Sequence, residues 1–266
     1  MPELPDVEVL RRYCEATSLH QEVRSVRVNS RLILGETSPS DLQTGLQGRT
    51  FEDTELHGKY LLVELDNGRW LVMHFGMTGS LKYVSKADRK PENTELLFAF
   101  SNGSRLAYLT TRKLGEIRLV GDAEVFIEEK DLGPDVLDSS FDFEAFQRAI
   151  AGRRAMIKST LMNQQIMAGI GNIYSDEILF QAGIHPRTPV DELSGKAKKK
   201  VFHTMQDVLR TAIDNQADPE DFPETYIIPH RHKEGTCPRC GGEVKQVEVS
   251  GRGAYYCPRR QGKAAN

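Results

Sequence analysis

The sequence predicts an α+β protein, with an N-terminal helix and a β-sandwich domain followed by a helical domain and a short β-hairpin. Three observations predict this class. Between residues 23 and 120, short apolar or alternating runs follow one another with turn signals between them. From residue 143 the apolar residues recur at helical spacing instead. Three cysteines are crowded into the last thirty residues, where two strand-like runs close a knuckle.

The composition is that of a soluble globular protein with room for more than one core. The chain has 266 residues, of which 39% are hydrophobic and 27% charged. It contains no apolar run long enough for a membrane span and no cleavable leader pattern, so we expect a cytoplasmic protein. Changes in period and composition predict domains at residues 1–135, 136–226 and 227–266.

The charge is unevenly distributed. The net charge is −3, yet residues 227–266 hold eight Lys or Arg against three Glu, a local charge of +5 that leaves −8 for the rest. A basic end on an acidic body is compatible with a nucleic-acid partner, and equally with a solvated tail. Charge by itself leaves both interpretations open.

The first expected element is a helix that begins after Met1-Pro2-Glu3. An early proline and the carboxylates of Glu3 and Asp6 are typical of a first helical turn. The apolar side chains that would anchor this helix are Leu4, Val7, Leu10 and Cys14. A chemical interpretation stands beside this structural one. Removal of Met1 would leave Pro2 with a secondary amine of pKa about 8, able to attack an electrophilic carbon while Glu3 transfers protons.

The sandwich is expected from a series of short strand-like runs with hairpin-turn signals between them. The expected strands are Val23–Val28, Thr50–Leu56, Lys59–Leu65, Arg69–Phe75, Ser80–Val84, Glu95–Phe100, Arg105–Leu109 and Glu116–Val120. Asp66-Asn67-Gly68 and Ser101-Asn102-Gly103 are strong turn signals between such runs. Residues 131–140 have the composition of a linker. The expected helices beyond it are Phe143–Ala151, Ala155–Asn163, Ile173–Ala182 and Lys196–Asn215.

Two segments of the C-terminal half have the pattern of a binding site. Gly169-Ile-Gly171-Asn172 runs directly into a helix, and such a turn presents backbone N–H groups and a positive dipole to a phosphate. Many tight helix–helix turns share that pattern. Gly251-Arg252-Gly253 would form a hairpin tip with Arg252 projecting, and a projecting arginine can hold a phosphate. An exposed surface arginine is the commoner case.

The three C-terminal cysteines have the spacing of a zinc ribbon with one ligand missing. Cys237 and Cys240 form a Cys-Pro-Arg-Cys motif, and Cys257 opens a second motif in which Arg260 stands at the place of the fourth ligand. Several outcomes remain open: zinc with His230, His232 or water as its fourth ligand, or no metal. We expect at most one structural zinc ion and no organic cofactor.

Together with Lys59 and the segment His74 to Gly79, these pieces resemble the formamidopyrimidine-DNA glycosylase and endonuclease VIII family. The resemblance rests on Pro2-Glu3-Leu4-Pro5, Gly58-Lys59-Tyr60-Leu61, His74 to Gly79, Gly169 to Glu177 and the cysteine hairpin, in the family's order. Leu4 favours the formamidopyrimidine branch. The resemblance implies a helix-two-turn-helix domain, a zinc-finger-like hairpin and a partner that is double-stranded DNA with damaged bases. We expect a monomer that contacts no membrane.

The resemblance also implies roles for individual residues. The implied catalytic residues are Pro2 as the nucleophile, Glu3 as the proton carrier, and Lys59, which would contact the DNA backbone near the lesion. The residues implied to contact DNA are His74, Met77, Arg112, Leu114, Asn172, Glu177 and Arg252. Of these, His74, Asn172 and Arg252 would hold phosphates. Met77, Arg112 and Leu114 would form a wedge that fills the gap left by a flipped base.

The implied activity is that of a bifunctional glycosylase and abasic-site lyase acting through an N-terminal proline Schiff base with β,δ-elimination. Asp6, Leu114 and Arg260 depart from the family's usual glutamate, phenylalanine and cysteine, and residues 214–229 lack its usual lesion-capping loop. Oxidised or ring-opened purines are the first expected substrates, with oxidised pyrimidines as the alternative. The rival hypotheses are a catalytically degenerate damaged-DNA-binding protein and, with little support beyond the basic tail, an RNA-associated protein.

Overall fold

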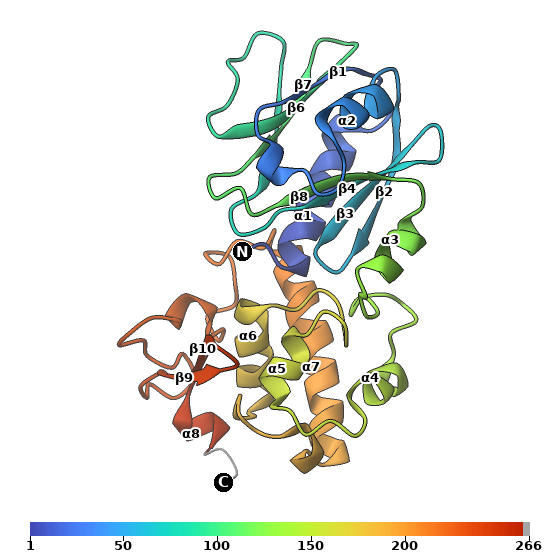
Figure 1. Ribbon diagram of the computed structural model, residues 1–266. Helices are drawn as coiled ribbons and strands as arrows, with labels where there is room; N and C mark the ends of the chain where they lie inside the picture. Colours follow the sequence, from blue (N-terminus) through green and yellow to red (C-terminus); the bar gives the residue numbers. More distant parts are fainter. Residues whose placement is uncertain (263–266) are drawn as a thin grey trace. The chain divides into compact units, whose positions relative to one another are not determined.

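The structure is a computed structural model that describes residues 1–262. The chain forms two compact units, one from Met1 to Lys130 and one from Asp131 onward (Figure 1). The first unit combines a helix with two β-sheets, and the second is helical with a C-terminal β-hairpin. The expected α+β class is therefore confirmed.

The first unit begins with helix α1 (Leu4–Ser18) and continues as two antiparallel four-stranded sheets. One sheet has the order β1 (Val23–Val28), β6 (Thr94–Phe100), β7 (Arg105–Leu109) and β5 (Ser80–Val84). The other has the order β2 (Phe51–His57), β3 (Tyr60–Leu65), β4 (Trp70–His74) and β8 (Glu116–Val120). All eight expected strands are present, and their bounds agree with the sequence pattern to within one residue.

The two sheets pack face to face, as a sandwich requires. Phe51 of β2 makes edge contacts with Phe98 and Phe100 of β6, with ring centroids 5.7 Å apart in both pairs. The same core takes in Val7 and Cys14 of α1. Helix α1 is thus fixed along the sandwich by its apolar stripe, and this sets the direction in which its first turn points.

Two helices of the first unit were not expected. Helix α2 (Pro39–Leu46) is capped by Ser38, whose hydroxyl accepts from the Asp41 N–H, and helix α3 (Ala123–Glu129) is capped in the same way by Asp122. The 3-10 turn η1 (Arg31–Ile33) precedes α2. Helix α3 covers the outer face of the second sheet, where Phe126 is buried with Leu62 and Val72.

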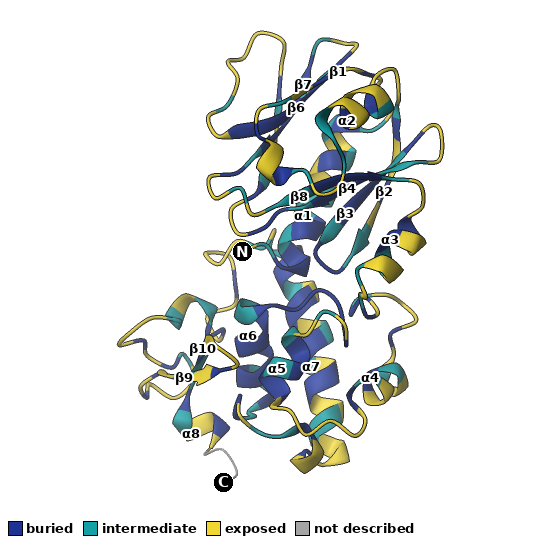
Figure 2. Cartoon of the chain, viewed as in Figure 1, coloured by how far each residue is buried: buried dark blue, intermediate teal, exposed yellow. Residues whose placement is uncertain are grey.

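The second unit is built around two helices, α6 (Asn172–Ala182) and α7 (Gly195–Asp214), which pack against each other. Helix α6 is buried along most of its length (Figure 2). The remaining elements are α4 (Phe143–Ile150), α5 (Ile157–Met162), the 3-10 turns η2 (Val190–Glu192) and η3 (Ile228–His230), the hairpin β9 (Lys245–Val249) and β10 (Arg252–Tyr256), and α8 (Pro258–Gln261). The four expected helices are all present.

Residues 131–142 are more ordered than their linker composition indicates. Asp135 forms a parallel bridge with Ala168, and the side chains of Val136 and Phe141 are buried in the second unit. The segment is therefore part of the second unit's packing. Among residues 1–262, no helix is long and apolar enough to cross a membrane.

Candidate functional site

The first turn of α1 presents the expected pair Pro2 and Glu3. Glu3 is the N-cap residue, with extended backbone and only 1% of its surface exposed, while Pro2 is half-buried. The Asp6 carboxylate accepts a hydrogen bond of 2.9 Å from the Glu3 N–H, and the two residues form a capping box. The turn therefore holds a carboxyl group next to the residue that would carry the amine.

Asp6 is the carboxyl group whose ionisation this turn disfavours. Burial raises the pKa of Asp6 from 3.8 to about 6, because a charged carboxylate is poorly solvated there, and the nearby charge of Glu3 adds to the effect. The hydrogen bond from the Glu3 N–H acts in the opposite direction. Asp6 can therefore gain or lose a proton close to neutral pH.

Three strand ends meet at one end of the second sheet. Tyr60, His74 and Glu116 are register partners across β3, β4 and β8. Because neighbouring strands are antiparallel, the start of β3, the end of β4 and the start of β8 share that end. Lys59 immediately precedes β3 and is largely buried, and the turn that carries Met77 immediately follows β4. The register thus brings together residues that are distant in the sequence.

His74 is a neutral hydrogen-bond donor at this sheet end. Burial, and next the positive charge of Lys59, lower the pKa of His74 to about 4. Its Nδ1 accepts from the Gly76 N–H at 3.3 Å, so the ring proton is on Nε2. Such an N–H can donate to a phosphate without adding charge.

Beyond the sheet end, two loops form a single tip. The hydroxyl of Thr78 accepts from the N–H groups of Thr111 and Arg112 at 3.2 and 3.1 Å. A Cβ at Gly76 would lie 2.5 Å from the Leu114 carbonyl, so only glycine permits this close approach. Leu114 is 55% exposed and the neighbouring Met77 is 40% exposed. These apolar side chains are therefore available to a partner, unlike core residues.

In the second unit, Asn172 begins helix α6 directly after the glycine turn. The side chain of Gln164 holds that turn, donating to the Ile170 carbonyl at 2.8 Å and accepting from the Gly169 N–H at 3.0 Å. The side-chain oxygen of Asn172 is buried and has no hydrogen-bond partner among the described residues. The positive end of an eleven-residue helix lies at this position, which suits an anion.

Glu177 lies one turn further along α6 and faces the interior. Its carboxylate accepts from the Ile228 N–H at 2.9 Å and from the Gln181 amide at 2.6 Å, and the residue is fully buried. Burial raises the pKa of Glu177 to about 7, although these hydrogen bonds oppose the shift. In this structure the side chain fixes the segment that contains η3.

Arg252 lies on the hairpin, but the tip is formed by Ser250 and Gly251 and does not include Arg252 as the sequence pattern indicated. The turn residues are Ser250 and Gly251, both with positive φ, and Arg252 pairs with Val249 as the first residue of β10. The Arg252 side chain is exposed. It therefore projects from the strand that leaves the turn.

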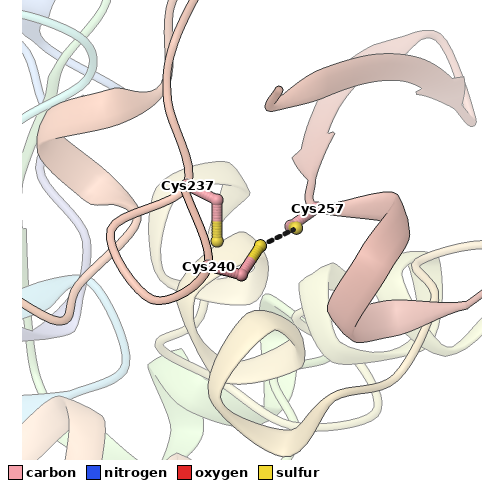
Figure 3. Close-up of side chains that lie close together, drawn as sticks. All are labelled: Cys237, Cys240 and Cys257. Carbon is pink, nitrogen blue, oxygen red and sulfur yellow. Dashed lines mark hydrogen bonds between the residues drawn. The ribbon is translucent and has the colours of Figure 1, made fainter. Parts of the chain in front are cut away.

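The three hairpin cysteines converge, as Figure 3 shows. The Sγ atoms of Cys237, Cys240 and Cys257 all lie within 4.8 Å of one another, a spacing that suits tetrahedral zinc. Among the described residues no His, Asp or Glu joins this group. The guanidinium of Arg260 lies 5.9 Å from the ring centroid of Phe180. The residues present therefore offer three thiolate ligands.

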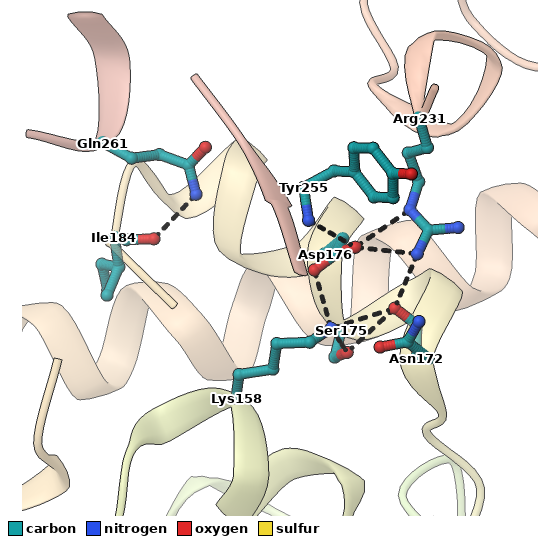
Figure 4. A network of polar contacts seen from close by, with 8 residues as sticks. All are labelled: Lys158, Asn172, Ser175, Asp176, Ile184, Arg231, Tyr255 and Gln261. Atoms are coloured by element: carbon teal, nitrogen blue, oxygen red, sulfur yellow. Dashed lines mark hydrogen bonds and ion pairs between the residues drawn. The ribbon is translucent and has the colours of Figure 1, made fainter. Parts of the chain in front are cut away.

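One polar cluster was missed by sequence reasoning. It is centred on Asp176 of α6, with Lys158 and Arg231 as its cationic partners (Figure 4). The available signal was Lys158, the one charged residue of the short helix α5.

Three family models match successive parts of the chain. They are described as the formamidopyrimidine-DNA glycosylase N-terminal domain at residues 1–117, the formamidopyrimidine-DNA glycosylase H2TH domain at residues 132–222, and a zinc finger found in FPG and IleRS at residues 235–259. The matches follow the order of the two units, and together they cover most of the chain.

Relatives and solved structures match over nearly the full length. The formamidopyrimidine-DNA glycosylase of Moorella thermoacetica is 36% identical, covering 97% of this chain and 92% of the relative, and that of Pelobacter propionicus is 34% identical, covering 98% and 100%. Among solved structures, the Lactococcus lactis enzyme bound non-covalently to DNA with an abasic site has a TM-score of 0.88 at 28% identity. A mutant of that enzyme with Fapy-dG-containing DNA gives the same values, and both cover 98% of this chain and all of theirs.

Proposed function

Because the chain belongs to the formamidopyrimidine-DNA glycosylase family, we propose that it is a bifunctional DNA glycosylase and abasic-site lyase of base excision repair. The observation that carries the proposal is the first turn of α1. It places a buried carboxyl group at Glu3 directly beside Pro2, where removal of Met1 would create a secondary amine. A protein that only binds DNA has no need of this arrangement.

In the proposed reaction, the nitrogen of Pro2 attacks the anomeric carbon of the damaged nucleotide. The new nitrogen–carbon bond replaces the glycosidic bond, and the base leaves. The Glu3 carboxyl group supplies a proton to the sugar ring oxygen as the C1′–O4′ bond breaks, which opens the ring and converts the aminal into an iminium, and then takes protons from the sugar. The resulting iminium withdraws electrons, so successive β- and δ-eliminations cut the strand on both sides of the lost nucleoside. Asp6, which titrates near neutral pH, can exchange protons with this turn.

The target base must leave the helical stack before the amine can reach its sugar, which costs a few kcal/mol. We assign the exposed tip of the first unit to this task. Met77 and Leu114 would enter the gap as apolar wedges, and Arg112 would hydrogen-bond the orphaned partner base. Leucine fills space without stacking as an aromatic ring would.

Phosphate contacts are assigned to one set of residues in each unit. Lys59 and the neutral His74 would hold the backbone from the sheet end of the first unit. Asn172 and Arg252 would do so from the second unit, through an amide at a helix start and an exposed guanidinium. Glu177 would hold the segment around Ile228 in place, because its carboxylate accepts a hydrogen bond from the Ile228 N–H.

The hairpin cysteines would hold one zinc ion per chain. Cys237, Cys240 and Cys257 supply three thiolates, and the ion's contribution would be structural, cross-linking the hairpin that carries Arg252.

Oxidised or ring-opened purines are the first substrates that we propose, and oxidised pyrimidines are the alternative. Residues 214–229, where the family's lesion-capping loop would lie, hold Pro219, Pro223 and an acidic run in place of a glycine-rich loop. The loop also carries two aromatic residues in contact, Phe222 and Tyr226, with ring centroids 5.7 Å apart. Release of free base from matched duplexes that each contain one lesion would rank these substrates.

Borohydride trapping tests the proposed chemistry. Reduction of the iminium should give a stable protein–DNA adduct through Pro2 on a duplex with one abasic or oxidised site. A preparation that keeps Met1 or carries an N-terminal extension is the matched control, and it should give no adduct. If correctly trimmed protein binds the duplex but gives none, the chain is a damaged-DNA-binding protein without lyase activity.

Glu3→Gln separates the two half-reactions. An abasic aldehyde is already electrophilic, whereas release of an intact base needs proton transfer. We therefore expect Glu3→Gln to lose lesion excision by roughly 10²- to 10⁴-fold while abasic-site trapping falls much less. Equal losses on both substrates would contradict the role given to Glu3.

A further inference from the structure

The polar centre of the second unit is the carboxylate of Asp176, which is fully buried beside the equally buried ammonium of Lys158 (Figure 4). Lys158 Nζ lies 2.7 Å from Asp176 Oδ1. Arg231 donates to Oδ2 through both Nε and Nη2, at 3.0 and 2.8 Å, and the backbone N–H of Tyr255 donates to the same oxygen at 3.0 Å. One carboxylate thus joins α5, α6, the segment after η3 and β10.

A cluster of this kind is a poor way to gain stability. A buried ammonium, a largely buried guanidinium and a buried carboxylate lose hydration that their mutual attraction only partly returns, so an apolar packing of similar volume is often as stable. The cluster instead fixes the relative positions of the groups that it joins, since each hydrogen bond holds one group in place against another. Its benefit should therefore be sought in the groups that it positions.

The first of these groups is Asn172. Its main-chain oxygen accepts from Lys158 Nζ at 3.0 Å and from Arg231 Nη2 at 3.3 Å, the same two cations that bind Asp176. Its side-chain oxygen has no hydrogen-bond partner among the described residues. The start of α6 is therefore held through the Asn172 backbone, and the amide side chain depends on that backbone for its position.

The second group is the hairpin. The Asp176 carboxylate bonds the backbone of Tyr255, three residues along β10 from Arg252. The β9–β10 ladder is continuous from Arg252 to Tyr256, so fixing one residue of β10 fixes the others. The guanidinium of Arg231 also lies 5.3 Å from the Tyr255 ring centroid. The hairpin is in this way tied to the helix start that carries Asn172.

We propose that Asp176 is a positioning residue that sets the spacing between Asn172 and Arg252, the two phosphate ligands of the second unit. This inference rests on the proposed function, because it takes both residues to bind DNA. Two ligands held at a fixed spacing bind adjacent phosphates cooperatively, since placing one phosphate places the other. Ligands without that link bind independently.

The test is a double-mutant cycle on a duplex that contains one tetrahydrofuran abasic analogue. Binding is measured for the native chain, Asn172→Ala, Arg252→Ala and the double variant, and the four are repeated in an Asp176→Asn background. In the native background, we expect the affinity loss of the double variant to be smaller than the product of the two single losses by roughly threefold or more. In the Asp176→Asn background, the loss of the double variant should equal that product. Lower stability alone would weaken all four proteins equally and leave the coupling unchanged.

A second variant guards against an Asp176→Asn protein that fails to fold. Arg231→Lys keeps the charge and the Lys158–Asp176 pair but removes the fork that bridges Asp176 and the Asn172 carbonyl, so the coupling should again be lost. Arg210→Lys is the matched control, because Arg210 lies on α7 and donates to Gln206 of the same helix at 3.2 Å, so its substitution should leave the coupling intact.

The outcomes separate the two proposals. If neither Asn172→Ala nor Arg252→Ala weakens binding, the phosphate contacts of the proposed function are wrong. If each weakens binding but their effects are independent in the native background, or their coupling survives both Asp176→Asn and Arg231→Lys, the positioning role is overturned while the DNA contacts stand.

Discussion

Asp6 and Glu177 are two carboxyl groups whose ionisation folding opposes. Burial is the main cause in both, and the pKa values rise to about 6 and about 7. One lies beside the proposed nucleophile and the other beneath the segment that contains η3. At neutral pH each is therefore a proton reservoir as well as a hydrogen-bond acceptor, and the protein's stability has to depend on pH.

Asp6→Asn isolates the first of these effects. Because folding raises the pKa of Asp6, its contribution to stability is complete below 3.8 and is lost as the pH rises through about 6. Asparagine keeps the oxygen that accepts from the Glu3 N–H but cannot ionise. We expect the unfolding free energy of Asp6→Asn to rise relative to the native chain by roughly 2 kcal/mol between pH 4.5 and 7.5.

Urea unfolding followed by the fluorescence of Trp70, the single tryptophan, measures this difference within the first unit. Comparison of variant with native protein at each pH cancels the titration of the other groups. A difference that stays constant across the range would contradict the raised pKa.

Candidate residues could be identified from the sequence, but their surroundings could not. Pro2 and Glu3 are adjacent in the chain, so local pattern was enough to pair them. Asp176 and Arg231 are far apart in the sequence, and nothing local indicates that one carboxylate would bind both Arg231 and Lys158. Networks of this kind depend on packing, which periodicity does not encode.

At the scale of elements, the tip of the first unit behaves as one piece because a single hydroxyl joins its two loops. Thr78 accepts from two backbone N–H groups, and its Oγ1 also lies 3.1 Å from the Thr110 hydroxyl oxygen. Met77 precedes Thr78 directly, and one of the two N–H groups belongs to Arg112. The proposed wedge and the proposed reader of the orphaned base are thus positioned together.

Thr78→Val keeps the shape of the side chain and removes this acceptor. Each of the two lost hydrogen bonds should cost about 1 kcal/mol, so we expect lesion flipping to weaken by roughly tenfold or more. Fluorescence of 2-aminopurine placed beside the lesion reports the flipped population. Thr78→Ser keeps the hydroxyl and is the control that should behave as the native chain. Equal effects from valine and serine would show that the hydroxyl does not organise the tip.

The hairpin is anchored by contacts that need no metal. Arg187 donates twice to the Glu248 carbonyl, and Gln261 donates to the Ile184 carbonyl at 2.8 Å while accepting from the Cys257 N–H at 2.8 Å. We therefore expect a chelator to remove at most one zinc ion per chain without unfolding the second unit. Metal analysis and thermal unfolding by circular dichroism, with and without chelator, measure the two quantities.

Arg260→Cys is the matched variant for the metal site, because it restores a fourth thiol to the motif. Four thiolates complete a tetrahedral site, so its zinc affinity should exceed that of the native chain by about tenfold or more in competition with a chromogenic chelator. Unchanged affinity, or unfolding of the native chain on chelation, would contradict this account of the hairpin.

Elements were easier to predict than the contacts between them. Alternating apolar residues and the Asn-Gly turns are local signals, and they located all eight strands of the sandwich. Helices α2 and α3 were missed although Ser38 and Asp122 are good capping residues, because each helix is short and lies next to strand-like runs. The register that aligns Tyr60, His74 and Glu116 involves strands distant in the chain, so no local pattern could give it.

At the scale of the whole molecule, an acidic chain has to bind a polyanion. With a net charge of −3, long-range attraction to DNA is weak, so affinity must come from a few well-placed cations. The cations that we assign to DNA are Lys59, Arg112 and Arg252. The lysines at the start of α7, in contrast, carry no assigned contact. Because only some of the cations are assigned to DNA, the salt dependence of binding tests which cations contact the DNA backbone.

Each phosphate neutralised by a cation contributes about −0.9 to the slope of log K against log salt concentration, so the two cations assigned to the DNA backbone, Lys59 and Arg252, predict a slope of about −2. Arg252→Ala should make the slope shallower by about one unit, as loss of one phosphate contact requires.

His74→Ala should weaken binding with no change of slope, since His74 is neutral above pH 5 and donates a hydrogen bond without charge. Titration of a fluorescent abasic duplex at several salt concentrations gives all three slopes. A native slope near −6 would show that further cations, such as the lysines of α7, bind the backbone, and a changed slope for His74→Ala would show that the imidazole is charged when DNA is bound.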